Sequence, residues 1–243
     1  MTQVAVVTPY FREPLEMLRR CHESVLAQDM DVTHFMVADG FPNAELKDWV
    51  QLRHVVLPAA HADNGNTPRG LGATLAEAEG FQFVAFLDAD NWYHLGHLKA
   101  LLKLWQDTRA DICCSARTFH DDEGLELAGV FDQDELAHTH VDTSCLLIHQ
   151  RAYESHRIWL KMPKQLSPVC DRVFFQYIRQ RYRIAFTTQK TVAFRTQYAS
   201  HFRAAGREPP SSAKTDVGAE PYRWMRTLEG VRTTVQRLGF YPG

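Results

Sequence analysis

The hydrophobic pattern of the chain centres on residues 83–87, FVAFL, an uninterrupted apolar run that ends at Asp88-Ala89-Asp90. A short continuous apolar run predicts a strand buried on both faces, as at the centre of a parallel sheet. Open α/β sheets bind their ligands at the carboxyl ends of the strands. Because side chains two positions apart on an extended chain point the same way, we expect both carboxylates to face one crevice.

A pair of carboxylates spaced in this way is typical of a site for a hard divalent cation. Proteins hold such ions with one or two carboxylates, while water and the phosphate oxygens of a substrate complete the shell. The other interpretation of Asp88 and Asp90 is an acidic turn exposed to solvent. The apolar strand before the pair and the aromatic residues Trp92 and Tyr93 after it favour a metal–diphosphate site.

Around this strand, other apolar runs alternate with stretches in which apolar residues recur at helical spacing. Thr67-Pro68 predicts the start of one helix, since an N-cap hydroxyl is followed by proline at the first helical position. The alternation predicts an α/β fold with a mostly parallel central sheet flanked by helices. The predicted strands span 3–8, 34–38, 53–57, 83–87 and 111–119, and the predicted helices span 13–26, 44–49, 67–79 and 94–105.

The alternation fades after Gly124. Residues 183–188 and 191–196 predict a β-hairpin. Residues 204–220 are small, polar and rich in proline, which predicts a mobile loop with almost nothing to anchor it. The remaining predicted elements are a strand at 143–149 and helices at 151–157, 169–180 and 222–238.

The composition predicts an ordinary globular domain. The chain has 243 residues, of which 45% are hydrophobic and 23% charged, and its net charge is −2 with no basic block. Nucleic acid is therefore disfavoured as a partner, because affinity for the phosphate backbone needs clustered Lys and Arg. No stretch has the length of a transmembrane segment, and the N-terminus lacks the features of a signal peptide, so we expect a cytoplasmic protein. The five cysteines include no C-x-x-C pair and indicate neither a disulfide framework nor a zinc site.

Several segments, taken in order, resemble family-2 glycosyltransferases of the GT-A fold. They are TPYFRE, ADG, NTPRGLGATLAEAEG and FLDADNWY in about the first hundred residues, followed more loosely by HVDTSCLLIHQRAY, VCDRVFF and TVAFRTQYASH. The resemblance implies a Rossmann-like GT-A domain in which residues 1–120 bind the nucleotide sugar. Residues 121–243 would form a smaller, acceptor-side C-terminal region of the same domain.

The same resemblance implies transfer of a sugar from a nucleoside diphosphate sugar, expected to be a UDP-sugar, to an acceptor hydroxyl. The acceptor would be a saccharide, a lipid-linked molecule or another hydroxyl compound, and the cofactor Mn²⁺ or Mg²⁺. Asp39 matches the carboxylate that accepts from uracil, although a turn residue is an equal alternative. Arg69 matches a basic position near the diphosphate. The positions that match nucleotide-binding residues are Thr8, Pro9, Tyr10, Glu13, Asp39, Arg69, Asp88 and Ala89.

Asp90 matches the metal ligand, and His201 resembles a late histidine that binds metal or diphosphate. Asp171 aligns with the catalytic base of inverting members, where a Glu-Asp pair begins a helix, but Cys170 replaces the Glu. A plain N-terminal carboxylate of the helix is the alternative role for Asp171. Asp142 is the rival base, because it precedes a strand that should reach the cleft.

Two other functions stay open at this point. A nucleotidyltransferase would share the sheet and the metal, but it needs a glycine-rich loop after the first strand, and 9–14 contains no glycine. A catalytically silent nucleotide-sugar-binding protein would keep Asp39 and Asp90 and lack a working base. The loop 204–220 follows His201, and we expect it to order over bound donor and exclude water.

Overall fold

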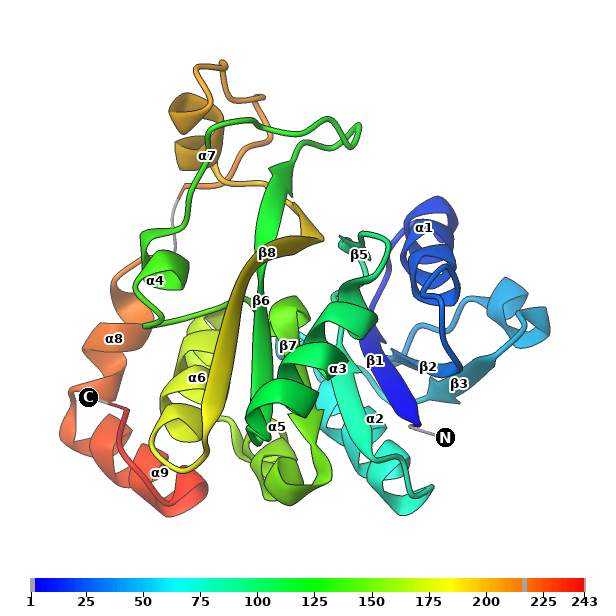
Figure 1. Ribbon diagram of the computed structural model, residues 1–243. Helices are drawn as coiled ribbons and strands as arrows, with labels where there is room; N and C mark the ends of the chain where they lie inside the picture. The colour runs from blue at the N-terminus through cyan, green and yellow to red at the C-terminus, as the bar shows by residue number, and fades with distance from the viewer. Residues whose placement is uncertain (1–2, 216–217, 243) are drawn as a thin grey trace.

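The computed structural model describes residues 3–215 and 218–242, and its framework is an eight-stranded sheet with helices on both faces (Figure 1). The strand order is β3-β2-β1-β4-β7-β6-β8-β5. The strands are β1 (Val4–Tyr10), β2 (Val32–Ala38), β3 (Leu52–Val56), β4 (Phe83–Phe86), β5 (Trp92–Tyr93), β6 (Ile112–His120), β7 (Leu146–His149) and β8 (Ile184–Arg195).

The described helices differ widely in length, and the three longest, α1, α2 and α3, belong to the first half of the chain. They are α1 (Leu15–Leu26), α2 (Asn66–Ala78), α3 (His97–Thr108), α4 (Gln133–Leu136), α5 (Arg157–Lys161), α6 (Cys170–Arg179), α7 (Ala199–Ala204), α8 (Glu220–Met225) and α9 (Leu228–Leu238). None of the helices in the described part of the chain combines the length and the apolar character that a membrane crossing needs.

The sheet is mixed, whereas the sequence predicted a mostly parallel one. Strands β3, β2, β1 and β4 run parallel, and so do β6 and β8, but β7 is antiparallel to both β4 and β6, as β5 is to β8. A parallel pair needs a long crossover connection. The chain between β6 and β7 is long enough, but its described helix, α4, is too short to carry it back along the sheet, and the chain returns antiparallel.

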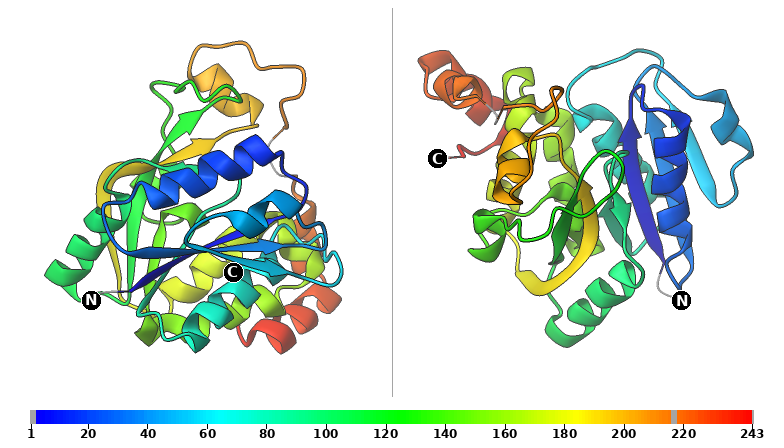
Figure 2. Two further views of the ribbon diagram at one scale, coloured as in Figure 1. Left: turned by 90° about the vertical axis from the view of Figure 1, so that its right-hand side faces the viewer. Right: turned by 90° about the horizontal axis from the view of Figure 1, so that it is seen from above.

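The strand order reverses between β1 and β4, and this places the carboxyl ends of both strands beside a crevice. The chain moves from β1 to β2 and β3 on one side, and α2 then carries it back to β4 on the other side of β1. Because such crossovers are right-handed, α1 and α2 must cover opposite faces of the sheet, as Figure 2 shows. A reversal of this kind is the point at which α/β sheets bind ligands.

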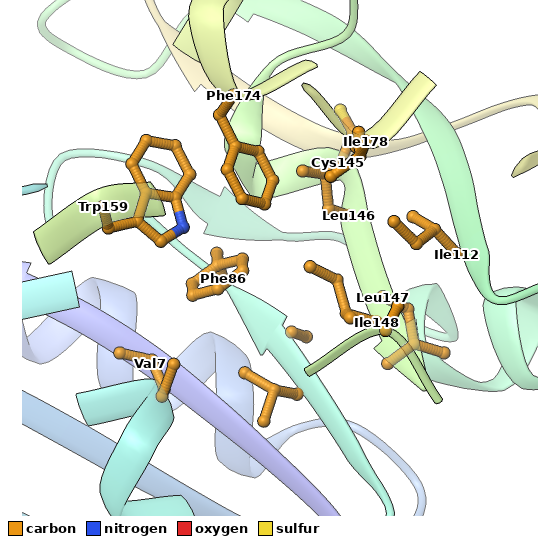
Figure 3. Packing of buried hydrophobic residues seen from close by; sticks show 14 of the residues in the cluster. Val7, Phe86, Ile112, Cys145, Leu146, Leu147, Ile148, Trp159, Phe174 and Ile178 are labelled. Atoms are coloured by element: carbon orange, nitrogen blue, oxygen red, sulfur yellow. The ribbon is translucent and has the colours of Figure 1, made fainter. Parts of the chain in front are cut away.

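The core continues from the sheet into the helices beneath it. Strand β4 is buried throughout, as its apolar run predicted. Figure 3 shows Phe86 close to Trp159 and Phe174, whose rings stack at 4.2 Å. On the same face, Gly72 of α2 lets the helix approach Val7, because a Cβ there would lie 2.6 Å from the valine side chain. This tight packing fixes α2, and with it the residues at its N-terminus.

Two predicted elements are wrong. The predicted hairpin at 183–196 is one continuous strand, β8, which passes beside β6 with register shifts between Cys114 and Arg117. The polar residues at 187–191 belong to this irregular stretch, and a β-bulge absorbs an extra residue without reversing the chain. The predicted final helix is divided into α8 and α9, because Thr227 leaves the helical conformation and caps α9 by accepting from the amide of Gly230.

Other elements differ mainly at their ends. Helix α2 begins at Asn66, after Gly65 in the left-handed conformation, so Thr67 is not the N-cap. The Thr67 amide and hydroxyl instead bond to Asp63. Three predicted segments contain 3₁₀ turns in place of regular structure: Ala44–Asp48, Thr143–Cys145 before β7, and Gln150–His156 before α5.

Candidate functional site

Two cavities meet at the carboxyl ends of β1 and β4. The first cavity, of about 400 Å³, is lined by residues that all come from 9–90. The second cavity, of about 500 Å³, draws mostly on residues 117–222. The cavities share Asn64, Arg69 and Asp88, so a molecule in one can touch a molecule in the other.

Tyr10 closes one end of the first cavity and is held in place by polar contacts. Its hydroxyl lies 2.6 Å from the imidazole Nε2 of His54 and accepts from the Asn43 amide at 3.0 Å. The neighbouring Thr8 is fully buried and bonds to His34 at 2.8 Å, so it supports β1 from behind and does not line the cavity. Pro9 lies between them and does line it.

Asp39 follows β2 and organises the loop that forms the far wall of the first cavity. Its carboxylate accepts from the backbone amides of His61 and Ala62 at 2.8 and 2.9 Å, and the His61 Nδ1 lies 3.0 Å away. An ionised carboxylate offers roughly four acceptor positions. Asp39 therefore keeps acceptor capacity toward the cavity while it holds the loop.

The buried Arg69 pairs with the partly exposed Asp88 between the two cavities. The guanidinium Nη2 donates to Asp88 at 2.5 Å, and its carbon lies 4.8 Å from the ring centre of Trp159. Burial by itself lowers the Arg69 pKa, but the Asp88 carboxylate outweighs it and leaves that pKa raised. Arg69 is therefore a permanent cation in the first turn of α2.

Asp90 faces the first cavity with about a third of its side chain exposed. Burial, and next the neighbouring Asp88, raise the Asp90 pKa to about 7, against the effect of Arg195, whose Nη1 lies 4.0 Å away. Glu13 also faces this cavity, and it shapes the turn after β1 by accepting from the Phe11 and Arg12 amides. Negative charge thus accumulates around Asp90.

The charges of the first cavity decide which cation could bind there. Its lining includes five carboxylates and, as a cationic side chain, Arg69, so a diphosphate would meet a negative wall. The described residues contain no group of three or more His, Cys, Asp or Glu placed to hold a metal. Mg²⁺ and Mn²⁺ fit such a site, since they take one or two carboxylates and complete their shell with phosphate oxygens and water. The five carboxylates are Glu13, Asp39, Asp63, Asp88 and Asp90.

Asp142, on the wall of the second cavity, is buried and paired with its neighbours. It accepts from the guanidinium of Arg117 at 2.8 Å and from the amide of Ser144 at 2.9 Å, which caps the 3₁₀ turn before β7. Arg117 also bonds to Asp132 and lies 3.6 Å from Glu135. Burial raises the Asp142 pKa, and Arg117 opposes that rise.

Asp171 is more accessible, since 37% of its side chain is exposed to the second cavity at the start of α6. One oxygen accepts from the Arg172 amide at 2.7 Å, and the other lies 3.2 Å from the His140 Nε2. Burial tends to raise the Asp171 pKa, but the contact with His140 and the helix amide outweigh it and lower it to about 2. Cys170, at the position where the resemblance implies Glu, is buried, and burial raises its pKa to about 12.

His201 lies on α7 and lines the second cavity, whereas Asp90 lines the first. Its Nδ1 is 2.7 Å from the Thr196 hydroxyl, and its ring meets Phe119 edge to face at 4.6 Å. The structure thus does not bring the two predicted metal ligands into one cavity. Asn91, next to Asp90, is buried and joins the Ser144 hydroxyl to the backbone of Arg195.

Arg195 and Arg117 are site residues that the sequence patterns did not predict. Arg195 ends β8 and connects Asp90 to Asp122, to which it donates at 2.8 Å. The sequence predicted a hairpin over 183–196, and a hairpin gave no reason to place Arg195 beside Asp90. Arg117 carried a signal that we did not use, since a charged residue inside a predicted buried strand needs a partner.

Within the loop at 204–220, residues 216 and 217 lie outside the described residues. The prediction that it lacks anchors is wrong for the described part. Arg207 donates to Asp121 at 2.8 Å, and the backbone of Lys214 pairs with Gln197 and Ala199. Its mobility and its closure over a ligand stay predictions.

The solved structures with a similar fold include several of S. aureus TarS. One matches with a TM-score of 0.63 at 13% identity, over 96% of this chain and 43% of that one, so the present chain spans less than half of that protein. A shorter TarS in complex with UDP matches with a TM-score of 0.62 at 13% identity, over 96% of this chain and 72% of that one. The same length of TarS in complex with UDP-GlcNAc matches with a TM-score of 0.61 at 12% identity, over 96% of this chain and 73% of that one. No curated protein matches the sequence.

At these identities the solved structures establish the fold alone, which is the GT-A-like α/β fold that the sequence predicted. The family description "Glycosyl transferase family 2" matches residues 5–205, well over half of the chain. The resemblance seen in the sequence, and the glycosyltransferase class that it implied, are thereby confirmed. The chain belongs to glycosyl transferase family 2.

Proposed function

We propose that this chain transfers a sugar from a UDP-sugar to an acceptor hydroxyl, with the donor in the first cavity and the acceptor in the second. The observation that carries the proposal is the junction of the two cavities at the Arg69–Asp88 pair. A bond between two substrates can form only where their sites meet. The TarS structures in complex with UDP and UDP-GlcNAc support the choice of donor.

The donor would lie along the carboxyl edge of the sheet. Tyr10 and Asp39 suit the uracil, since one offers an aromatic face and the other an acceptor for the N3–H. Asp88 suits the ribose, and Arg69 the diphosphate. Asp90, with Asp88 beside it, would hold Mn²⁺ or Mg²⁺, which when bound adds positive charge next to the leaving diphosphate.

The base that we propose is Asp171. It is exposed to the second cavity, whereas Asp142 is buried and paired with Arg117. In the reaction the acceptor O–H breaks and its proton passes to the Asp171 carboxylate. The oxygen bonds to the anomeric carbon, and the carbon–diphosphate bond breaks with its electron pair leaving on the diphosphate. Attack from the acceptor side in one displacement inverts the anomeric centre.

Arg69 stabilises the leaving group by its fixed position. A cation that is already in place when charge grows on the diphosphate needs no reorganisation during the reaction. Its bond to Asp88 and its contact with Trp159 hold it there before the donor binds. We propose a saccharide, lipid-linked or other hydroxyl compound as the acceptor.

The function can be tested with a panel of nucleotide sugars, with and without Mn²⁺, by following release of the nucleoside diphosphate in the presence of mixed saccharide acceptors. UDP-sugars should be consumed, and Asp171→Asn should slow their consumption by about 100-fold or more while leaving UDP binding in place. Thermal shift adds an independent readout, because a ligand that binds the native state raises the melting temperature. Stabilisation by UDP without any transfer would indicate a binding protein.

A further inference from the structure

His140 is a buried polar residue whose ring nitrogens lack well-aligned hydrogen-bond partners among the described residues. Its side chain is 6% exposed and lines the second cavity. Buried polar atoms without partners are costly and uncommon in native proteins.

The Asp171 carboxylate lies beside the His140 ring. The His140 Nε2 lies 3.2 Å from the Asp171 Oδ2, which is within reach of an ion pair although not aligned as a full hydrogen bond. Contacts between catalytic groups are often poorly aligned before substrate binds and tighten in the complex. The Phe175 ring, edge-on at 5.8 Å, limits how far the imidazole can turn away.

The other oxygen of Asp171 is held by its own helix, through the Arg172 amide at 2.7 Å. The Arg172 guanidinium is directed elsewhere and donates to Asp134 at 2.7 Å. His140 is therefore the side chain whose ring nitrogen lies against the Asp171 Oδ2. Asp171 is 37% exposed and His140 only 6%, so Asp171 is the member of the pair that can reach an acceptor.

We propose that His140 is a positioning residue, which fixes the Asp171 carboxylate so that a free lone pair faces the acceptor hydroxyl. This inference rests on the proposed function. In the tautomer with the proton on Nε2, the imidazole donates to Oδ2 while the helix amide donates to Oδ1. The carboxylate is then held at both oxygens, and the acceptor proton transfers to Asp171 along one direction. His140 itself takes up no atom of either substrate.

His156 offers a matched control. It is also buried, with both ring nitrogens unpartnered among the described residues, but it packs against Phe86 and Tyr153 away from both cavities. A general effect of replacing a buried histidine should appear equally in His140→Leu and His156→Leu.

The kinetic test compares His140→Leu, His140→Gln and His156→Leu. His140→Leu should lower kcat by roughly tenfold or more with the donor KM within about twofold, because the effect arises in the transition state. His140→Gln keeps an N–H donor and should retain most of kcat, as should His156→Leu. In an Asp171→Asn background, His140→Leu should cost nothing further. Full kcat in His140→Leu, or equal losses in the leucine and glutamine variants, would overturn the proposal.

A second readout does not depend on activity. NMR titration of the Asp171 side-chain carbonyl should show its pKa rising by about one unit or more in His140→Leu, since a partner of the charged form is lost, and staying unchanged in His156→Leu. An unchanged Asp171 pKa in His140→Leu would also refute the pairing. If the wild-type chain transfers no sugar, the proposed function fails, and this titration still decides whether His140 holds Asp171.

Discussion

Asp90 combines two features that suit a metal ligand. It faces the first cavity, and its charge is opposed by Asp88 and only distantly compensated by Arg195 at 4.0 Å. Binding of a divalent cation would relieve this repulsion. Asp88, in contrast, already has a close partner in Arg69.

Asp90→Asn should therefore abolish metal-dependent binding of UDP and leave the fold intact, because the residue follows the end of a strand and lies outside the core. Calorimetric titration of UDP with Mn²⁺ measures this directly. Asp122→Asn is the matched control, since Asp122 shares Arg195 with Asp90 but does not line the first cavity. Unchanged affinity in Asp90→Asn would remove Asp90 as the ligand.

The two candidate bases should respond differently to the same change. Asp171→Asn should lower kcat by about 100-fold or more with little effect on donor binding, because a general base acts in the transition state. Asp142→Asn should mainly lower the melting temperature, because it leaves Arg117 with one buried carboxylate fewer. Full turnover in Asp171→Asn together with lost turnover in Asp142→Asn would exchange the two roles.

At the scale of elements, Arg117 on β6 lies close to three carboxylates from other segments. They are Glu135 of α4, Asp132 just before α4, and Asp142 at the start of the 3₁₀ turn before β7. Burial, opposed by Arg117, raises the pKa of Glu135 to about 7, and Asp132 and Asp142 add to that rise. The native state thus holds a proton that the unfolded chain releases near pH 4.5. The stability from this group is present at low pH and is lost as the pH rises through 7.

Glu135→Gln should remove this dependence. The free energy of unfolding of the variant minus that of the wild type should increase by about 2 kcal/mol from pH 5 to pH 8. The difference between their melting temperatures should increase by roughly 4–8 °C over the same range. Thermal unfolding at the two pH values tests it, and Glu154→Gln, in an exposed pair with Arg157, should show no such change. A constant difference between Glu135→Gln and the wild type at both pH values would mean that Glu135 is ionised throughout.

The sequence predicted the elements that depend on local patterns and missed those that depend on distant partners. The apolar run of β4, the helical spacing of α3 and the reversal point at Asp88 follow from periodicity and topology. The continuous path of β8 depends on its pairing with β6. The antiparallel direction of β7 depends on the connection from β6, which the hydrophobic pattern does not specify. The pairing of Asp142 with Arg117 and the approach of His140 to Asp171 likewise need the tertiary fold.

At the scale of the whole molecule, the fold builds the two cavities from different halves of the chain, which in the proposed function would separate donor from acceptor. The first cavity uses β1, β2 and the start of α2, while the second uses segments from 117 onward. The loop after α7 follows His201 on the second cavity and is held at Arg207 and Lys214. The two anchors tie the loop to the segments that follow β6 and β8.

Trypsin cleavage after Arg207 or Lys214 should therefore slow sharply when UDP and Mn²⁺ are present, if the loop orders over the donor. Cleavage after the exposed Lys47, in the 3₁₀ turn before β3, serves as the control and should not change. Equal rates with and without ligand at Arg207 and Lys214 would show that the loop does not act as a lid.

The central claim, that donor and acceptor occupy separate cavities joined at Arg69 and Asp88, is tested most directly by a crystal structure with UDP and Mn²⁺ bound. The account predicts uracil between Tyr10 and Asp39, the diphosphate beside Arg69, and the metal on Asp90, with the second cavity left open in front of Asp171. Uracil in the second cavity, or a metal bound away from Asp90, would contradict it.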